Sequence, residues 1–379
     1  MEGIPLSTKI DFTRDVISAG HAIDLGVVEK TARAGEKYWM HWSCYSKSVG
    51  IDPLLLEHTD PLIRDVVITA FAARVRSGYY SCGREIRVSE VTEAISAISK
   101  TIKLAGYQSP VYRSPNVYNL SIQRLVKGYR REDPPSVPQL AVPVPVPDNM
   151  ADIAYLTECP LLHAIADLAI IAFYYLLRIG EYTVAKMIER NGRKIISTCT
   201  VQFMVGNIGF FHKGNKVIEQ RSPLTELLEC DQCTYKITNQ KSGCMGQTIS
   251  HEGIMNHNNG PVKATARRVH HILSYGGDET TIISAYLAAD DGTWKTVSSV
   301  QMRSGVRTSG KQLDLLKNGI DANLVGVHSL HAGGAIALKL AAGESDTTIQ
   351  KYGRWSSTTF LDYIHNQIAH LSKSISTTK

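Results

Sequence analysis

Six of the fourteen prolines stand in one short stretch, DPPSVPQLAVPVPVPD, at residues 133–148. Proline fixes φ, lacks a backbone N–H and disfavours the helical conformation in the residue before it. Because such a stretch can neither continue a helix nor sit inside a sheet, we expect extended, polyproline-like chain there. A chain of 379 residues is long enough for two hydrophobic cores. The sequence therefore predicts two domains, residues 1–132 and 150–379, joined by a linker at residues 133–149.

The first domain carries helical periodicity along its length. Residues 21–48 place aromatic side chains at three-residue spacing, and LIRDVVITAFAARVR repeats apolar residues at helical intervals. In SEVTEAISAISKTIKLAG we expect Ser89 to cap the first turn, one apolar face to follow and Gly106 to end the helix. A further helix is expected at about residues 116–131. These patterns predict a small bundle of four or five helices.

Basic residues gather near the end of that last helix: Arg124, Lys127, Arg130 and Arg131. Cations stabilise a helix C-terminus, and they also bind phosphates. Taken alone, the cluster fits a solvated surface better than a phosphate-binding one. The whole chain has 41 Lys and Arg against 35 Asp and Glu, a net charge of +6, which suits a polyanionic partner without requiring one.

The second domain begins with PLLHAIADLAIIAFYYLLRIGEYTVAKM, an almost wholly apolar helix interrupted by Arg178 and then Glu181. A charged residue there needs a partner or a cleft, so a buried Arg178–Glu181 pair and a functional role are both open. Residues 194–250 have the composition of antiparallel hairpins, with Lys241 at the tip of the last one. Helices then resume. The expected fold class is mostly α with a small antiparallel sheet.

Cysteine usage and hydropathy bear on metal binding, disulfide formation and cellular location. Seven scattered cysteines indicate reduced thiols, and Cys230 and Cys233 could bind zinc only with Cys244, His251 or His257, in a spacing that fits no common finger. We therefore expect no metal and no cofactor. No apolar run reaches the roughly 18 to 20 residues of a membrane span, and the N-terminus lacks a signal peptide's apolar core. We expect an intracellular protein, nuclear if the host is a eukaryote.

Near its end the chain reads VHSLHAGGAIALKLAAGESDTTIQKYGRWSSTTFLDYIHNQ, with His, Trp and Tyr in one helical stretch. A tyrosine phenol has a pKa near 10, so a tyrosine that attacks needs a base and a site rich in positively charged donors. Phosphodiester cleavage uses such a site: arginines hold the non-bridging oxygens, a His or Trp adds a donor, and a lysine protonates the leaving oxygen.

Five elements in order make this sequence resemble the tyrosine recombinases, the phage-integrase family. They are FYYLLRIGEYT with Arg178, ITNQKSGCMGQTISH with Lys241, HSLH with His328 and His331, GRW with Trp355, and FLDYIHN with Tyr363. The local texture of NQKSGCMGQ, HSLHAGGAIALKL and GRWSSTTFLDYI looks most like recombinases of Crypton and DIRS-type mobile elements. The resemblance extends over nearly the whole chain.

The resemblance implies a helical, SAM-like core-binding domain followed by an α+β catalytic domain. Tyr363 would attack the scissile phosphate to form a 3′-phosphotyrosyl link, and His328 would help to take the phenol proton. Arg178 would hold the phosphate and Trp355 would line it. Lys241 would protonate the departing oxygen. Double-stranded DNA is the implied partner, with a possible homo-tetramer on paired sites.

His331 departs from the family pattern, which asks for a second arginine there. Histidine is shorter than arginine, lacks its planar fork and is mostly neutral at pH 7. Removing one transition-state donor costs on the order of a hundred- to a thousand-fold in rate. A nearby phosphate could raise the pKa of His331, or Arg354 could lean in, although neither reproduces the fork. A slowed recombinase, a domesticated DNA-binding protein without activity and a type IB topoisomerase therefore all stay open.

DNA affinity should outlast catalysis because phosphate contacts are numerous and spread. Besides the four basic residues of the first domain, the expected contacts are Lys263, Arg267, Arg268, Arg303 and Arg307. Such binding should weaken steeply with salt.

Overall fold

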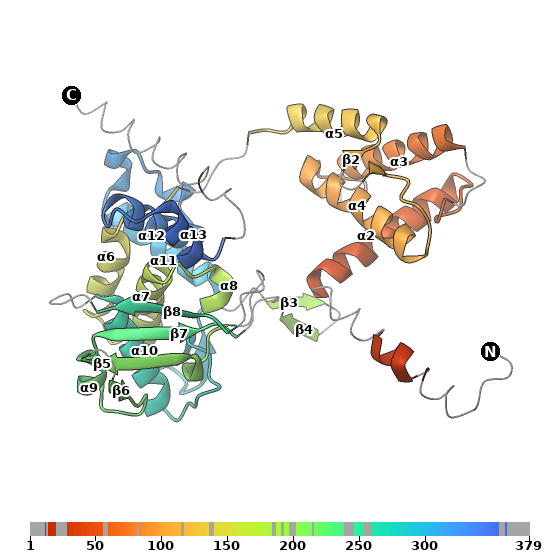
Figure 1. The fold of residues 1–379 in the computed structure, drawn as a ribbon. Coiled ribbons are helices and arrows are strands. Elements are labelled where there is room, and N and C mark those ends of the chain that lie inside the picture. Colours follow the sequence, from red (N-terminus) through yellow and green to blue (C-terminus); the bar gives the residue numbers. More distant parts are fainter. Residues whose placement is uncertain are drawn as a thin grey trace. The chain divides into compact units, whose positions relative to one another are not determined.

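A computed structural model describes residues 12, 14–19, 29–55, 60–81, 83–114, 117–135, 140–183, 187–190, 193–196, 202–213, 216–238, 246–253, 259–355 and 361. The chain divides into two compact units, residues 1–136 and 137–379. Both are drawn in Figure 1. No described helix combines the length and the apolar character needed to cross a bilayer.

Unit 1 is a helical bundle with one short hairpin. Its elements are α2 (Glu29–Ser48), α3 (Pro61–Arg76), α4 (Val88–Leu104), β1 (Tyr112–Ser114), β2 (Val117–Tyr118) and α5 (Leu120–Glu132). The apolar face expected on α4 is buried, and Trp42, Phe71 and Ile122 complete a core with no exposed surface. Wide apolar stripes on each helix account for this packing.

A buried cation ties three helices of unit 1 together. Arg76, at the end of α3, donates to the Ile86 carbonyl across 2.6 Å and to the Asp133 carboxylate. Asp133 follows α5, and its other oxygen accepts from the backbone N–H of Val88 at 2.9 Å. The expected cap at Ser89 is therefore wrong: α4 begins at Val88 and is capped from the end of α5.

Unit 2 contains most of the secondary structure. Its helices are α6 (Pro145–Ala154), α7 (Pro160–Tyr174), α8 (Ile179–Tyr182), α9 (Leu224–Leu228), α10 (Pro261–Ser274), α11 (Ser299–Gln312), α12 (His328–Leu340) and α13 (Asp346–Gly353), with 3₁₀ turns at Val205–Asn207, Leu315–Asn318 and Ala322–Leu324. Its strands are β3 (Met187–Arg190), β4 (Arg193–Ile196), β5 (Ile208–His212), β6 (Lys216–Ile218), β7 (Gln232–Lys236), β8 (Thr248–Glu252), β9 (Ala285–Leu287) and β10 (Trp294–Thr296).

The main sheet of unit 2 has the order β6-β5-β7-β8 with every pair antiparallel. Phe210 opposes Cys233, and Ile249 opposes Tyr235, so alternate residues face the core. Helix α10 packs against β7 and β8 and also against α7. The expected fold class, mostly α with a small antiparallel sheet, is confirmed.

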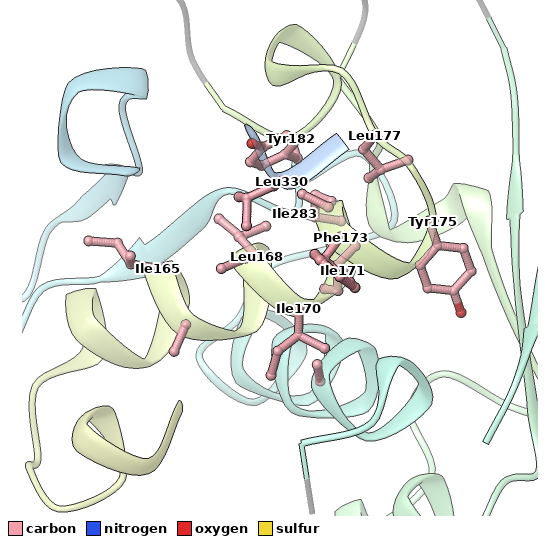
Figure 2. Close-up of a cluster of buried hydrophobic side chains, with 14 of the residues drawn as sticks. Ile165, Leu168, Ile170, Ile171, Phe173, Tyr175, Leu177, Tyr182, Ile283 and Leu330 are labelled. Carbon is pink, nitrogen blue, oxygen red and sulfur yellow. The ribbon is translucent and has the colours of Figure 1, made fainter. Parts of the chain in front are cut away.

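Helix α7 is the centre of unit 2, in contact with α6, α10, α11 and α12. Its buried side chains are apolar apart from Asp167, as Figure 2 shows for Ile165, Leu168, Ile170, Ile171 and Phe173, with Ile283 and Leu330 from other segments. A helix that is apolar all round is stable only when it is surrounded by other elements. The turn after the C-terminal end of α7 carries Arg178.

The proline-rich stretch is only partly extended. Leu140 and Val142 are buried in extended chain, and their backbone N–H groups donate to the carbonyls of Leu324 and Ser329. From Pro145 the chain is helical, because the first turn of a helix tolerates residues without an N–H. The expectation of polyproline-like chain to residue 148, and of a linker to residue 149, is thus wrong: residues 140–149 belong to unit 2.

Candidate functional site

The turn that follows α7 carries Arg178. The helix ends at Tyr174, and Leu176 adopts a left-handed conformation with φ of 47° while the Leu177 N–H donates back to Ala172. This is a Schellman-type end with leucine in place of the usual glycine. The expected long helix through Arg178 is therefore wrong. Arg178 instead occupies the N-cap position of the short helix α8.

Glu181 holds that turn from inside. Its Oε2 accepts from the backbone N–H of Arg178 at 2.8 Å, and its Oε1 lies 3.8 Å from Nη1 of the same residue. The side chain of Glu181 is 1% exposed, whereas that of Arg178 is 28% exposed. The ion pair left open by the sequence thus exists, and it still leaves part of the Arg178 guanidinium at the surface.

A second arginine reaches the same carboxylate from the other end of unit 2. Arg354 follows α13, and its Nη2 lies 2.9 Å from Oε2 of Glu181 and 2.7 Å from the Leu176 carbonyl. Its side chain is 1% exposed. From the sequence, Arg354 is expected only as a side chain that could approach the site of His331. The structure brings it fully into the interior, where it ties α13 to the end of α7.

Helix α12 places His331 next to this pair of arginines, with His328 one turn earlier on the same helix. The helix approaches α7 closely at Gly334, where an added Cβ would lie 2.0 Å from the Phe173 carbonyl oxygen. Gly333 makes a similar approach to the backbone of Val142. Side chains larger than hydrogen would hold α12 away from the Arg178 turn, so the Gly-Gly pair sets the position of His331.

His331 is buried and uncharged. Burial, followed by the positive charges of Arg178 and Arg354, lowers its pKa to about 3. The ring packs edge-on against Trp355, with centroids 4.7 Å apart at 71°. Within the described residues, neither His331 Nε2 nor Arg178 Nη1 has a hydrogen-bond partner. A neutral imidazole at position 331 does not supply the positive charge that an arginine would have there.

His328 is the first residue of α12 and is exposed to solvent. Desolvation of its ring lowers the pKa of His328, and the nearby charge of Arg303 lowers it further. A histidine that is neutral at pH 7 can accept a proton. Arg303 itself is exposed on α11, close enough to act on this histidine.

Two of the expected catalytic residues, Lys241 and Tyr363, lie outside the described residues. Lys241 falls in the connection between β7 and β8, strands that pair as expected. Tyr363 comes two positions after Leu361, which packs in an apolar cluster with Ile336 and Trp355. The structure thus brings together Arg178, the two histidines and Trp355.

The four basic residues of α5, namely Arg124, Lys127, Arg130 and Arg131, are exposed. Residues three, four and seven apart lie on one side of a helix, so they form a basic surface along α5. Lys263 on α10 is half-buried. These positions are accessible to an anionic ligand.

Three arginines that were expected on a DNA-binding surface, Arg267, Arg268 and Arg307, have contacts within unit 2. Arg268 is 1% exposed and donates to the carbonyls of Ile283 and Ala285, so that expectation is wrong. Burial lowers the pKa of Arg268 to about 10. Arg267 is bound at 2.7 Å to the buried carboxylate of Asp167. Arg307 donates to two carbonyls, at positions 323 and 325.

The candidate zinc residues do not assemble in the part of the chain that is described. Cys230 and Cys233 are buried thiols, and burial raises their pKa values, to about 11 and about 12. No group of three His, Cys, Asp or Glu side chains suited to a metal occurs among the described residues. Cys244 and His257 lie outside them.

No protein-family model matches the chain, and no curated protein matches it. Solved structures similar to it include the integrase of the Tn1549 transposon in complex with circular intermediate DNA, at 10% identity and a TM-score of 0.42 over 78% of each chain. A variant of that integrase in complex with transposon right end DNA has a TM-score of 0.41 at the same identity and coverage. This degree of similarity leaves the family of the chain open.

Proposed function

We propose that this chain is a DNA-binding tyrosine recombinase of a mobile element, slowed by the histidine at position 331. Arg178 and Trp355 converge on helix α12, whose first residue is His328, and this arrangement carries the proposal. These residues come from three distant segments, and each has the chemical type and order that the sequence resemblance requires. The resemblance of HSLHAGGAIALKL and GRWSSTTFLDYI favours a Crypton or DIRS-type element.

In the proposed reaction the Tyr363 oxygen attacks the scissile phosphorus and its proton passes to the neutral ring of His328. The bond from phosphorus to the 5′ oxygen breaks, and Lys241 gives that oxygen a proton. The products are a 3′-phosphotyrosyl link and a free 5′-hydroxyl. The exposed part of Arg178 would hold a non-bridging oxygen. Rejoining reverses these steps with the 5′-hydroxyl of another strand, within a proposed homo-tetramer.

Slowing follows from the charges of the site. Two arginines and one glutamate share the interior, and one of the arginines is 1% exposed. Of this pair of arginines, the transition state would therefore meet only the guanidinium of Arg178, and position 331 adds no second one of the kind expected of the family. Loss of one such donor typically lowers the rate on the order of a hundred- to a thousand-fold.

The neutral His331 and the buried Arg354 also favour a second candidate function. With His331 neutral and Arg354 bonded to Glu181, the chain could bind DNA through α5 and no longer cut it. Such a protein would be a domesticated DNA-binding protein. The two candidates differ in whether Tyr363 forms a covalent link.

The test begins with duplexes selected by the full-length protein from a random pool, each then nicked next to the candidate cleavage position so that religation is blocked. Covalent adducts are sought on denaturing gels for wild type, Tyr363→Phe and His331→Arg. The recombinase proposal expects a faint adduct in wild type, a stronger one in His331→Arg and none in Tyr363→Phe. Adduct in neither wild type nor His331→Arg, with DNA still bound, would favour the second candidate.

A further inference from the structure

The loop between α3 and α4 in unit 1 holds an exposed aromatic ring on a support of stacked side chains. Tyr79 is 66% exposed. Its ring meets Tyr80 edge-on at 5.1 Å, and Tyr80 lies flat on His41 with centroids 4.2 Å apart and 8° between planes. The guanidinium carbon of Arg74 lies 4.8 Å from the Tyr79 centroid and 4.9 Å from that of Tyr45. We call these five residues the aromatic ladder.

The loop is fixed at both ends. The Ile86 N–H donates to the Arg76 carbonyl at 3.0 Å, and the Arg76 guanidinium returns a bond of 2.6 Å to the Ile86 carbonyl. Gly78 has φ of +76°, and an added Cβ there would lie 2.0 Å from the Arg84 carbonyl oxygen. The ring of Tyr79 is therefore presented by a backbone that is already ordered, so little conformational entropy remains to be lost on binding.

The base of the aromatic ladder is in the core. Tyr45 is 8% exposed and meets Phe71, which is fully buried, at 5.5 Å. The Tyr80 hydroxyl donates to the His41 carbonyl at 3.4 Å. A tyrosine that served only to fill the interior would be buried like Tyr45. Tyr79 instead leaves most of its surface in water, with Tyr80 at its edge and Arg74 over its ring.

The charge in contact with the ring is positive. Arg74 is stacked on it, and the exposed Arg84 follows in the same loop. Glu85, the acidic residue of this loop, lies 3.0 Å from the buried Arg76, which also pairs with Asp133. An aromatic ring beside guanidinium groups matches a nucleotide, which has a flat base and an anionic phosphate.

We propose that the aromatic ladder binds an unpaired nucleotide of DNA, with the base stacked on Tyr79 and the adjoining phosphate near Arg74. In an intact duplex both faces of each base are covered, so the ring would find its partner only in single-stranded or branched DNA. The inference rests on the proposed function only in that the partner is DNA. No residue of the candidate recombinase site takes part in it.

The full-length protein is titrated with one labelled oligonucleotide, first as a single strand and then annealed to its complement. Stacking of one base is worth about 1–3 kcal/mol, so Tyr79→Ala should weaken single-strand binding about five-fold or more and leave duplex binding within about two-fold. Tyr79→Phe keeps the ring and should bind as wild type does. Tyr107→Ala, at a position 38% exposed in the same unit and outside the ladder, is the matched control.

Equal affinities of Tyr79→Ala and Tyr107→Ala for the single strand would overturn the inference, as would an equal loss on the duplex. A loss in Tyr79→Phe as large as in Tyr79→Ala would also contradict it, because the phenol and not the ring would then be responsible. Thermal unfolding of each variant establishes that unit 1 is folded. No step depends on cleavage, so absence of a Tyr363 adduct would defeat the proposed function and leave this result unchanged.

Discussion

Arg178 donates from Nη2 to the backbone oxygen of Arg354 across 2.7 Å, although the two residues are 176 positions apart. The reverse contact also exists, since Arg354 donates to the carbonyl of Leu176, two residues before Arg178. Each guanidinium thus fixes the turn that carries the other. Both guanidinium groups also pair with the carboxylate of Glu181. This reciprocal arrangement makes the geometry of the site depend on a few buried polar groups.

Glu181→Ala should destabilise unit 2 by about 3–5 kcal/mol, because it removes the buried carboxylate that pairs with Arg354 and that accepts from the backbone N–H of Arg178. Chemical denaturation of the full-length protein, followed by circular dichroism, measures the change. Glu219→Ala, at an exposed position of the same unit, is the control and should stay within about 0.5 kcal/mol. A loss below about 1 kcal/mol in Glu181→Ala would contradict the role given to this carboxylate.

His331→Arg places a third guanidinium beside two others that already share one carboxylate. Without an anion we expect a lower stability, by about 1–3 kcal/mol, because a buried charge lacks a partner. Phosphate should recover part of the loss by occupying the site. The comparison is thermal unfolding of wild type and variant in phosphate and in chloride at equal ionic strength. If the loss were the same in both salts, the site would not be one that binds phosphate.

The pH dependence of stability should carry the signature of His331. Its pKa is about 3 in the folded chain, against about 6.5 when unfolded. The unfolded chain therefore binds more protons below pH 6.5, and the contribution of His331 to stability falls as the pH drops from 6.5 towards 3, by at most about 1.4 kcal/mol per pH unit.

Denaturant unfolding of wild type and His331→Gln at a series of pH values isolates this effect. The difference between the two should be constant above pH 7 and should shrink as the pH falls, since glutamine does not titrate. His328 and other histidines with lowered pKa are present in both proteins and cancel in the difference. A difference that did not change with pH would mean that the pKa of His331 is the same in the folded and the unfolded chain.

Periodicity was a sound guide to most of the elements, and it failed where chain ends are set by distant contacts. The apolar run from Pro160 predicts a helix through Arg178, but the helix stops at Tyr174 because Leu176 turns the chain in a left-handed conformation. Leucine is rarely found there, so no local signal marks the end. What supports the turn is Arg354, far along the chain.

The N-terminus of α4 is likewise set by a residue distant in the sequence. A serine at position 89 has the right chemistry and nearly the right place for an N-cap. The structure caps Val88 with Asp133 instead, 45 positions away, because the carboxylate is already held there by Arg76. In the candidate site, similarly, the sequence identifies Arg178, His328 and Trp355 by type and order. It could not show that Arg354 is buried against Glu181.

One contact in the site did leave a readable signal, the Gly-Gly pair in HSLHAGGAIALKL. Glycine inside a helix is unfavourable by about 0.5–1 kcal/mol relative to alanine, so two in succession suggest a close approach. Gly334→Ala should nevertheless lower stability by about 1–3 kcal/mol, because the new Cβ would lie 2.0 Å from the Phe173 carbonyl oxygen. Gly128→Ala, in the open on α5, should raise stability by about 0.5–1 kcal/mol. Opposite signs in denaturant unfolding are the expected result, and a stabilised Gly334→Ala would show that α12 does not depend on this approach to α7.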